Sequence, residues 1–265
     1  MRRFVAMLRR YFPAIVLFVV VIVVWEVGVR FFGVKGFILP APSAIWAALV
    51  DNWTTGYQIL DAAQVTMYEA LGGLLIGVTA GLVVAFGVSR WPGSRDTILP
   101  LAVAVNAIPI IAFAPLANSW FGILSPLSKM VVAASLVFFP IMINVLRGLT
   151  QVEPSALELM RSYAAGPIAV TRHLRIPNAL PFLFTGLKVA TTLTLIGAIV
   201  GEYFGGLNVA LGRVVVGSAS ALRFDVTWAA IMVVSVMGIG LYLIVVAIER
   251  VAIPWHASVR GEQPG

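Results

Sequence analysis

Six apolar runs, each long enough to cross a membrane, constrain this chain more than any other feature of its sequence. A helix of about 20 apolar residues spans the ~30 Å hydrocarbon core of a bilayer. The runs lie at about 14–32, 66–89, 97–119, 128–148, 182–204 and 227–250. The sequence therefore predicts an all-α polytopic membrane protein with about six transmembrane helices, forming one transmembrane domain over residues 1–265.

The composition agrees with the bilayer as the solvent of this chain. Hydrophobic residues make up 60% of it and charged residues 11%, whereas soluble domains carry about 45–50% apolar and about 25% charged residues. This composition excludes disordered chains and most soluble enzymes. The net charge is +7, but the basic residues are scattered between apolar runs and form no aromatic-interleaved patch. No nucleic-acid partner is therefore expected.

The sequence offers no constellation for catalysis or metal binding. The chain has no cysteine, which excludes disulfides, thiol catalysis and Cys-ligated metals. Neither His173 nor His256 has a second ligand at metal-binding spacing. Ser218 and Ser220 have no intramembrane histidine to act as a base. We therefore expect a protein that is not an enzyme, with no catalytic residue, no metal site and no cofactor of its own.

Arginine and lysine residues predict the orientation, because cytoplasmic loops of membrane proteins carry an excess of both. With the N-terminus inside, twelve of the 18 fall near cytoplasmic ends of spans, five near outer ends, and Lys188 lies within a span. Both termini are thus predicted to be cytoplasmic. The first run is expected to be a retained span, because it exceeds the about 7–15 residues of a signal-peptide core and lacks a small-residue cleavage site.

Two connecting segments carry short predicted helices. In the outer segment at about 33–65, Ser43 is expected to N-cap the amphipathic stretch AIWAALVDNW on the membrane surface. In the polar cytoplasmic segment at about 149–181, Pro154 suits the first turn of a helix. Gly166-Pro167 is expected to end that helix.

A second, shorter helix is expected after Pro167, and Pro177 and Pro181 are expected to break the chain before the fifth span. Two interpretations of this loop are open. It is either a surface element attracted to lipid headgroups by Arg161, Arg172 and Arg175, or a docking element for a soluble partner.

Part of this loop has the spacing of a known motif. The motif consists of E-A-A, three residues, a glycine, nine residues and then I-x-L-P. The corresponding positions hold Glu158, Leu159, Met160, Ala164, Leu174, Ile176 and Pro177. The pattern resembles the cytoplasmic loop of the permease subunits of type I ABC importers. Further stretches, NALPFLFTGLKVA, GAIVGEYFGG and LPAPSAIWAAL, resemble the nitrate/sulfonate/taurine branch, so the resemblance covers about residue 37 to the end of the sixth span.

The resemblance implies a docking loop for ATPase subunits, made by Glu158, Leu159, Met160, Arg161, Ser162, Ala164, Gly166, Leu174, Ile176 and Pro177. Leu159, Met160 and Ala164 depart from the family pattern. Ala164 stands at the glycine position, which suggests that the turn has moved to Gly166-Pro167.

By the same resemblance, the chain would be a permease subunit in a bacterial inner membrane, in contact with membrane lipid. Its partners would be two ATP-binding subunits, a second permease copy and a periplasmic or lipid-anchored substrate-binding protein. We expect a homodimer, and a heterodimer of permeases is the alternative. ATP would be bound by the partner, because no G-x-x-x-x-G-K-[ST] motif occurs in this chain.

The stretches ELMRSYAA and RIPNALP resemble most the pyrimidine- or riboflavin-precursor group, so the resemblance implies a substrate of that type. Few positive charges face the proposed pathway, which disfavours a strongly anionic substrate. The alternative is a nitrate-, sulfonate- or taurine-type anion. An ion-coupled secondary transporter is the rival function. It would require inverted repeats and charges at mid-span, whereas the sequence shows no convincing internal repeat and its carboxylates cluster near span ends.

The translocation pathway is expected along the third and fourth spans, where proline and asparagine disturb the helices, because such backbone is tolerated beside a watery cavity. The candidate lining residues are Asn106, Phe113, Asn118, Phe139, Asn144 and, at the end of the fifth span, Glu202. The alternative is that these residues hold helices together. That structural role is also expected for a small-residue face of the second span, made by Gly72, Gly73, Gly77 and Gly81.

Overall fold

The computed structural model describes residues 2–91, 97, 98, 100–102, 104, 109–207 and 209–254, with side chains from residue 12 onward except Ile110. In this part of the chain the regular elements are helices and no strand occurs, which confirms the predicted all-α class. The elements are α1 (Arg2–Phe31), α2 (Pro42–Asp51), α3 (Ile59–Val88), η1 (Ile110–Phe113), α5 (Ala114–Phe121), α6 (Pro126–Thr150), α7 (Pro154–Ser162), α8 (Pro167–Val170), η2 (Thr171–Arg175), α9 (Ile176–Tyr203), α10 (Leu211–Ser220) and α11 (Phe224–Ala252).

Five stretches of the described chain are long and apolar enough to cross a membrane. They lie in α1, α3, α6, the run through α8, η2 and α9, and α11, and each overlaps one of the predicted runs. The predicted run at 97–119 lies partly outside the described residues, and its described C-terminal part forms the 3₁₀ turn η1 and the short helix α5. A sixth span is therefore not confirmed.

The fifth span begins earlier than its apolar composition indicated. The chain is helical without a break from Pro167 to Tyr203, a run of 37 residues. Pro177 occupies the first turn of α9, where a missing N–H is tolerated, and Pro181 lies inside the helix. The expectation that these prolines break the chain is wrong. The irregularity lies just before them, in the π-helical turn η2.

Helix α6 is the centre of the bundle and packs against both α3 and α9. The contact with α3 is close because α3 presents glycine. A Cβ at Gly77 would lie 2.7 Å from the carbonyl oxygen of Ala134, and one at Gly81 would lie 2.9 Å from Cγ2 of Ile141. Side chains larger than hydrogen do not fit there, which confirms the structural role predicted for the small-residue face of α3.

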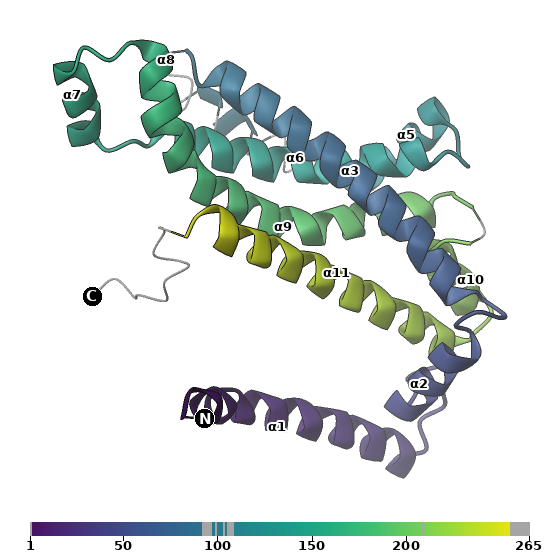
Figure 1. The fold of residues 1–265 in the computed structure, drawn as a ribbon. Coiled ribbons are helices and arrows are strands. Elements are labelled where there is room, and N and C mark those ends of the chain that lie inside the picture. The colour runs from purple at the N-terminus through teal and green to yellow at the C-terminus, as the bar shows by residue number, and fades with distance from the viewer. Residues whose placement is uncertain are drawn as a thin grey trace.

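Helix α1 lies apart from this bundle and approaches it only near its C-terminal end (Figure 1). There Trp25 packs edge-on against Trp228 of α11, with ring centroids 5.4 Å apart. Glu26 of α1 accepts hydrogen bonds from the backbone N–H of Ser43 (3.0 Å) and from its hydroxyl (2.8 Å). Ser43 is therefore not the N-cap of α2. Ala41 holds that position, and the Glu26 carboxylate satisfies an N–H of the first turn.

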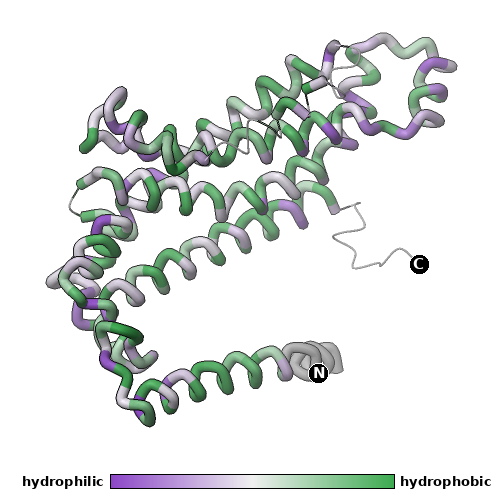
Figure 2. Tube along the Cα trace, turned by 180° about the vertical axis from the view of Figure 1, so that it is seen from behind, coloured by the Kyte–Doolittle hydropathy of each residue, from purple (hydrophilic) through white to green (hydrophobic). Residues whose placement is uncertain are grey.

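Hydrophilic residues gather at the two ends of the molecule (Figure 2). One, the loop end, carries α7, α8 and η2. The other, the opposite end, carries α2, α10 and the first turns of α3 and α11 (Figure 1). Apolar residues cover the helices between them, as expected for a structure whose middle lies in lipid.

Candidate functional site

Helix α7 projects from the loop end and buries none of its residues (Figure 1). Glu158 is exposed on it, and Leu159 is 57% exposed. Beyond it, Tyr163 is 75% and Ile168 is 83% exposed. Large apolar side chains presented together in a polar region mark an interaction surface. Together with Glu158, these three apolar side chains form what we call the docking face.

The C-terminus of α7 is closed by Ala164 in the left-handed conformation, at φ +50°. The N–H of Ala164 donates to the carbonyl of Arg161, and that of Ala165 donates to the carbonyl of Met160 at 3.0 Å. This is the Schellman pattern, in which glycine is the usual left-handed residue. The expectation that the turn moves to Gly166-Pro167 is wrong, because Gly166 has φ −70° and ψ 165°, which any residue adopts.

Asn178 fixes the base of the loop to the bundle. Its side-chain Nδ2 donates to the carbonyls of Gly148 (2.8 Å) and Gln151 (3.1 Å), which end α6. Gly148 permits this approach, since a Cβ there would lie 2.6 Å from Cα of Ala179. The remaining motif positions, Leu174, Ile176 and Pro177, therefore lie in a helix that is anchored beside the end of α6, away from α7 itself.

At the opposite end, Glu202 is fully buried and holds the N-terminus of α10. Its Oε2 accepts a hydrogen bond of 2.6 Å from the N–H of Gly212. Thr66 of α3 accepts a second one, of 3.0 Å, from the N–H of Leu211. Both donors belong to the first turn of α10, where N–H groups have no partner within the helix. A carboxylate at a helix N-terminus is also favoured by the helix dipole.

Two more buried charged residues, Glu69 of α3 and Lys129 of α6, accompany Glu202. The Lys129 ammonium donates to the carbonyl of Ile123 and, at 3.4 Å, to that of Ser125, so it satisfies the turn between α5 and α6. It is also close enough to both carboxyl groups for electrostatic attraction. We call Thr66, Glu69, Lys129 and Glu202 the buried polar cluster. It joins α3, α6, α9 and α10.

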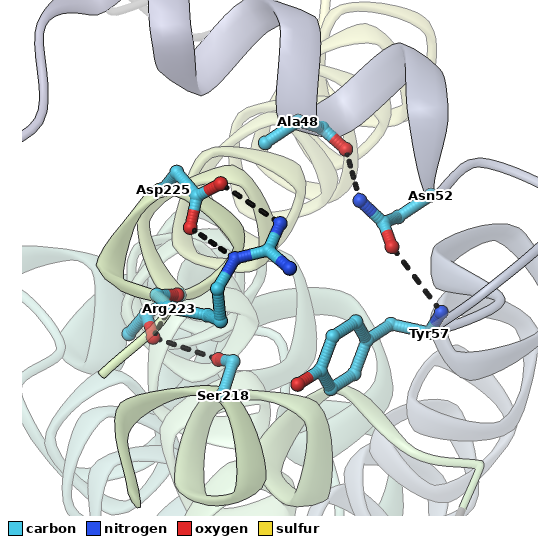
Figure 3. A network of polar contacts seen from close by, with 7 residues as sticks. Ala48, Asn52, Tyr57, Ser218, Arg223 and Asp225 are labelled. Atoms are coloured by element: carbon cyan, nitrogen blue, oxygen red, sulfur yellow. Dashed lines mark hydrogen bonds and ion pairs between the residues drawn. The ribbon is translucent and has the colours of Figure 1, made fainter. Parts of the chain in front are cut away.

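A second polar network lies where α2, α10 and α11 meet (Figure 3). Asn52 Nδ2 donates to the carbonyl of Ala48 at 2.8 Å, and the N–H of Tyr57 donates to Asn52 Oδ1 at 3.4 Å. Arg223 donates two hydrogen bonds, of 3.1 and 3.0 Å, to the carboxylate of Asp225. The Asp225 carboxylate raises the pKa of the Arg223 guanidinium above its usual value. These contacts order the turns that join the helices at this end.

The structure divides the predicted pathway residues into two groups. Phe113 and Asn118 lie on η1 and α5, and Asn118 is close to Gly205 beyond Glu202. Phe139 and Asn144 lie in α6, where Phe139 packs in the core and Asn144 Nδ2 donates to the carbonyl of Pro140 at 2.8 Å. Asn106 lies outside the described residues. Among the others Asn118 stands out, because it is buried and both its amide atoms lack a partner in the described chain.

Two charged groups were not selected from the sequence. One is Lys129, and the other is the ion pair of Lys188 on α9 with Glu249 on α11, at 2.5 Å. Each lysine is a lone charge inside or beside an apolar run, which marks a residue with a buried partner. That signal does not identify the partner, which is the distant Glu249 for Lys188 and the nearby carbonyls of Ile123 and Ser125 for Lys129.

Comparison with known proteins agrees with this architecture. A family model described as "Binding-protein-dependent transport system inner membrane component" matches residues 73–253. A probable ABC transporter permease protein of Haemophilus influenzae is 29% identical over 223 residues, covering 84% of this chain and 89% of the relative. The riboflavin transport system permease protein RibX of Chloroflexus aurantiacus is 29% identical over 237 residues, covering 89% and 87%. The formylaminopyrimidine transport permease protein ThiX of Halalkalibacterium halodurans is 29% identical over 239 residues, covering 90% and 94%.

These relatives are permease subunits of transporters and are not themselves enzymes. Membership of the family implies, in general terms, an ATPase and a substrate-binding protein as partners. With five apolar helices of sufficient length, the chain is a multi-pass inner membrane protein. It belongs to the family of binding-protein-dependent transport system inner membrane components, as an ABC importer permease of the sulfonate/taurine-like branch.

Proposed function

We propose that residues 149–181 form the cytoplasmic loop through which ATP-binding subunits drive this permease, with both termini on the same side of the membrane. The observation that carries this proposal is the docking face, where a helix without a buried residue presents Glu158 and Leu159, and Tyr163 and Ile168 are exposed just beyond it. An apolar surface of this kind is stable in a polar region when a partner covers it. The excess of arginine at this end supports the cytoplasmic orientation.

The assembly that fits this proposal has two permease subunits around the pathway and two ATP-binding subunits beneath them. ATP would be bound and hydrolysed only in those partners. A substrate-binding protein would deliver the solute to the opposite end. We propose a homodimer, because one chain then supplies both docking loops.

The test is co-purification of the tagged permease with its ATPase subunits in mild detergent, followed by an ATPase assay. Glu158→Arg reverses a charge on the docking face and should remove most of the bound ATPase while leaving membrane insertion intact. Asp51→Arg, an equal change on the exposed surface of α2, is the matched control and should retain the complex. Normal ATPase recovery with Glu158→Arg would overturn the docking assignment.

For the substrate, we propose a pyrimidine- or riboflavin-type precursor. The names of two relatives, RibX and ThiX, support this class. Uptake by cells that express the complete transporter should be competed by riboflavin or formylaminopyrimidine and not by taurine. Competition by taurine or an alkyl sulfonate alone would favour the anion alternative, which is also represented among the relatives.

We propose that the pathway passes beside α5 and α6, with Asn118 as the residue best placed to meet a solute. The unpartnered amide of Asn118 supports this role, because a buried amide without a hydrogen bond is costly unless water or a ligand satisfies it. Asn118→Leu should lower uptake while the ATPase complex still assembles. Asn144→Leu, in which a satisfied amide is removed, should change uptake less.

A further inference from the structure

A groove of about 970 Å³ lies at the loop end, between α7 and the ends of the spanning helices. The C-terminal end of α3, the end of α6, one face of α7 and the turn η2 all line it. Leu157 and Arg161 face it from α7, whereas the exposed Glu158 and Leu159 do not line it. Of the docking face, only Ile168 also lines the groove, so Glu158, Leu159 and Tyr163 form a surface apart from it.

The groove is strongly basic. Four arginines line it, Arg90, Arg161, Arg172 and Arg175, and its lining contains no carboxylate. Within the described part of the chain, none of the four side chains forms an ion pair or a hydrogen bond. Guanidinium groups gathered without an acidic partner repel one another, and an anion that enters the groove relieves this repulsion. Their planar geometry suits the oxygens of a phosphate group in particular.

Apart from Ser89 and Thr171, the rest of the lining is apolar. Phe86 of α3 and the buried Leu149 of α6 line the groove beside Ile176, at the point where the spanning helices end. A free inorganic anion gains nothing from these side chains. A phospholipid uses both parts of such a site, since its phosphate meets the arginines and its glycerol and upper acyl chain meet the apolar wall.

Two local features place the arginines on the groove. The left-handed Ala164 reverses the chain after α7 and directs it toward Pro167. The wider π-turn η2 then carries both Arg172 and Arg175, and such turns occur frequently at functional sites. As a result, the turn after α3, helix α7 and η2 contribute charge to one groove although more than eighty residues separate Arg90 from Arg175.

From this geometry we propose that the groove binds the phosphate headgroup of an anionic phospholipid and thereby braces α7 against the bundle. Helix α7 has no buried residue to hold it, and a phosphate shared by Arg90, Arg161 and Arg175 joins it to α3 and η2. The proposal rests on the proposed function only in assigning the groove to the cytoplasmic leaflet. The lipid site itself does not require an ATPase.

The experiment uses the full-length permease in nanodiscs of phosphatidylcholine with or without phosphatidylglycerol, with bound lipid measured by native mass spectrometry after release into detergent. Wild type should retain phosphatidylglycerol in preference to phosphatidylcholine. The triple variant Arg161→Gln/Arg172→Gln/Arg175→Gln should lose about tenfold or more of this retention. Arg147→Gln/Arg250→Gln, which removes charge outside the groove at the same end, is the matched control and should retain the lipid.

Inorganic phosphate distinguishes the two possible sources of the phosphate group. Hydrogen exchange in residues 154–163 should slow in nanodiscs that contain phosphatidylglycerol, and should not slow when phosphate is added to phosphatidylcholine nanodiscs. Protection by phosphate alone would overturn the lipid assignment. Equal phosphatidylglycerol retention by wild type and the triple variant would overturn the site. Because no step requires ATPase, loss of ATPase binding in Glu158→Arg and loss of lipid in the triple variant are separate results.

Discussion

At the opposite end of the molecule, buried side chains from α3 and α9 hold the short helix α10, whereas at the loop end α7 projects with no residue buried. Both helices are short and both connect spans. The difference lies in where their polar groups are satisfied. Glu202 and Thr66 satisfy the first turn of α10 from distant helices, while α7 closes its own end through Ala164. Contacts within the chain therefore hold α10 in place, whereas the exposed surface of α7 is available to a partner.

The largest effect is expected from Lys129→Met in the buried polar cluster. The change removes the donor to the turn between α5 and α6 and leaves Glu69 and Glu202 without their compensating charge. Removing one member of a buried charged group costs about 3–5 kcal/mol. Unfolding of the purified protein in detergent should show this loss. Lys35→Met, which removes an exposed lysine, should leave stability unchanged.

Glu202→Ala should have the next largest effect. It removes the acceptor for the N–H of Gly212 and costs about 1–3 kcal/mol, because the buried donor is left unpaired. Hydrogen exchange at the first turn of α10 should accelerate. Glu202→Gln keeps an oxygen acceptor and is the control. If the amides in the first turn of α10 exchange equally fast in both variants, the negative charge of the carboxylate holds α10 and the hydrogen bond does not.

Ala164→Gly should stabilise the structure, in contrast to the two changes above, and only at the loop end. A non-glycine residue in the left-handed conformation carries a strain of about 1 kcal/mol, which glycine removes. The amide of Ala165, which donates to Met160, should exchange about fivefold more slowly. Ala165→Gly is the control, because its backbone is not in this conformation, and it should give no such protection.

The smallest effect on stability is expected from Leu159→Ser combined with Tyr163→Ser. Both side chains are exposed and α7 buries nothing, so global unfolding should change by less than about 0.5 kcal/mol. A large loss of stability would show that α7 is held by the bundle, contrary to the contrast between the two ends.

Much of this fold could be predicted from the sequence, because an apolar run of about 20 residues is long enough to cross a bilayer as a helix. The spans carried by α1, α3, α6, α9 and α11 follow from it. The position of α7 followed from Pro154 and from the resemblance of the loop to a family motif. The docking role of that loop remains a prediction.

What could not be predicted depends on contacts between distant residues or on backbone conformation. Ser43 resembles an N-cap locally, but Glu26, seventeen residues earlier, supplies the carboxylate. Pro177 and Pro181 resemble breakers, but a π-turn before them lets the helix continue. Ala164 stands at the glycine position of the family motif, but alanine rarely adopts the left-handed conformation that the turn keeps there. The placement of Glu69 and Glu202 near Lys129 is set by the packing of α3 and α9 on α6, which composition does not encode.

The unbroken helical run from Pro167 to Tyr203 has a mechanical consequence. Its 37 residues measure roughly 55 Å at about 1.5 Å per residue, and the run begins beside the loop and ends at Glu202, which holds α10. The backbone of this run is helical throughout, with Pro181 inside α9. We expect a rotation or an axial displacement at Pro167 to be transmitted along this helix to Glu202, and so to the N-terminus of α10 on the other side of the membrane. Two positions interrupt the regular hydrogen bonding of this run, the π-turn at Thr171–Arg175 and Pro181 inside α9, so we expect these positions to set how much of a displacement at Pro167 reaches α10.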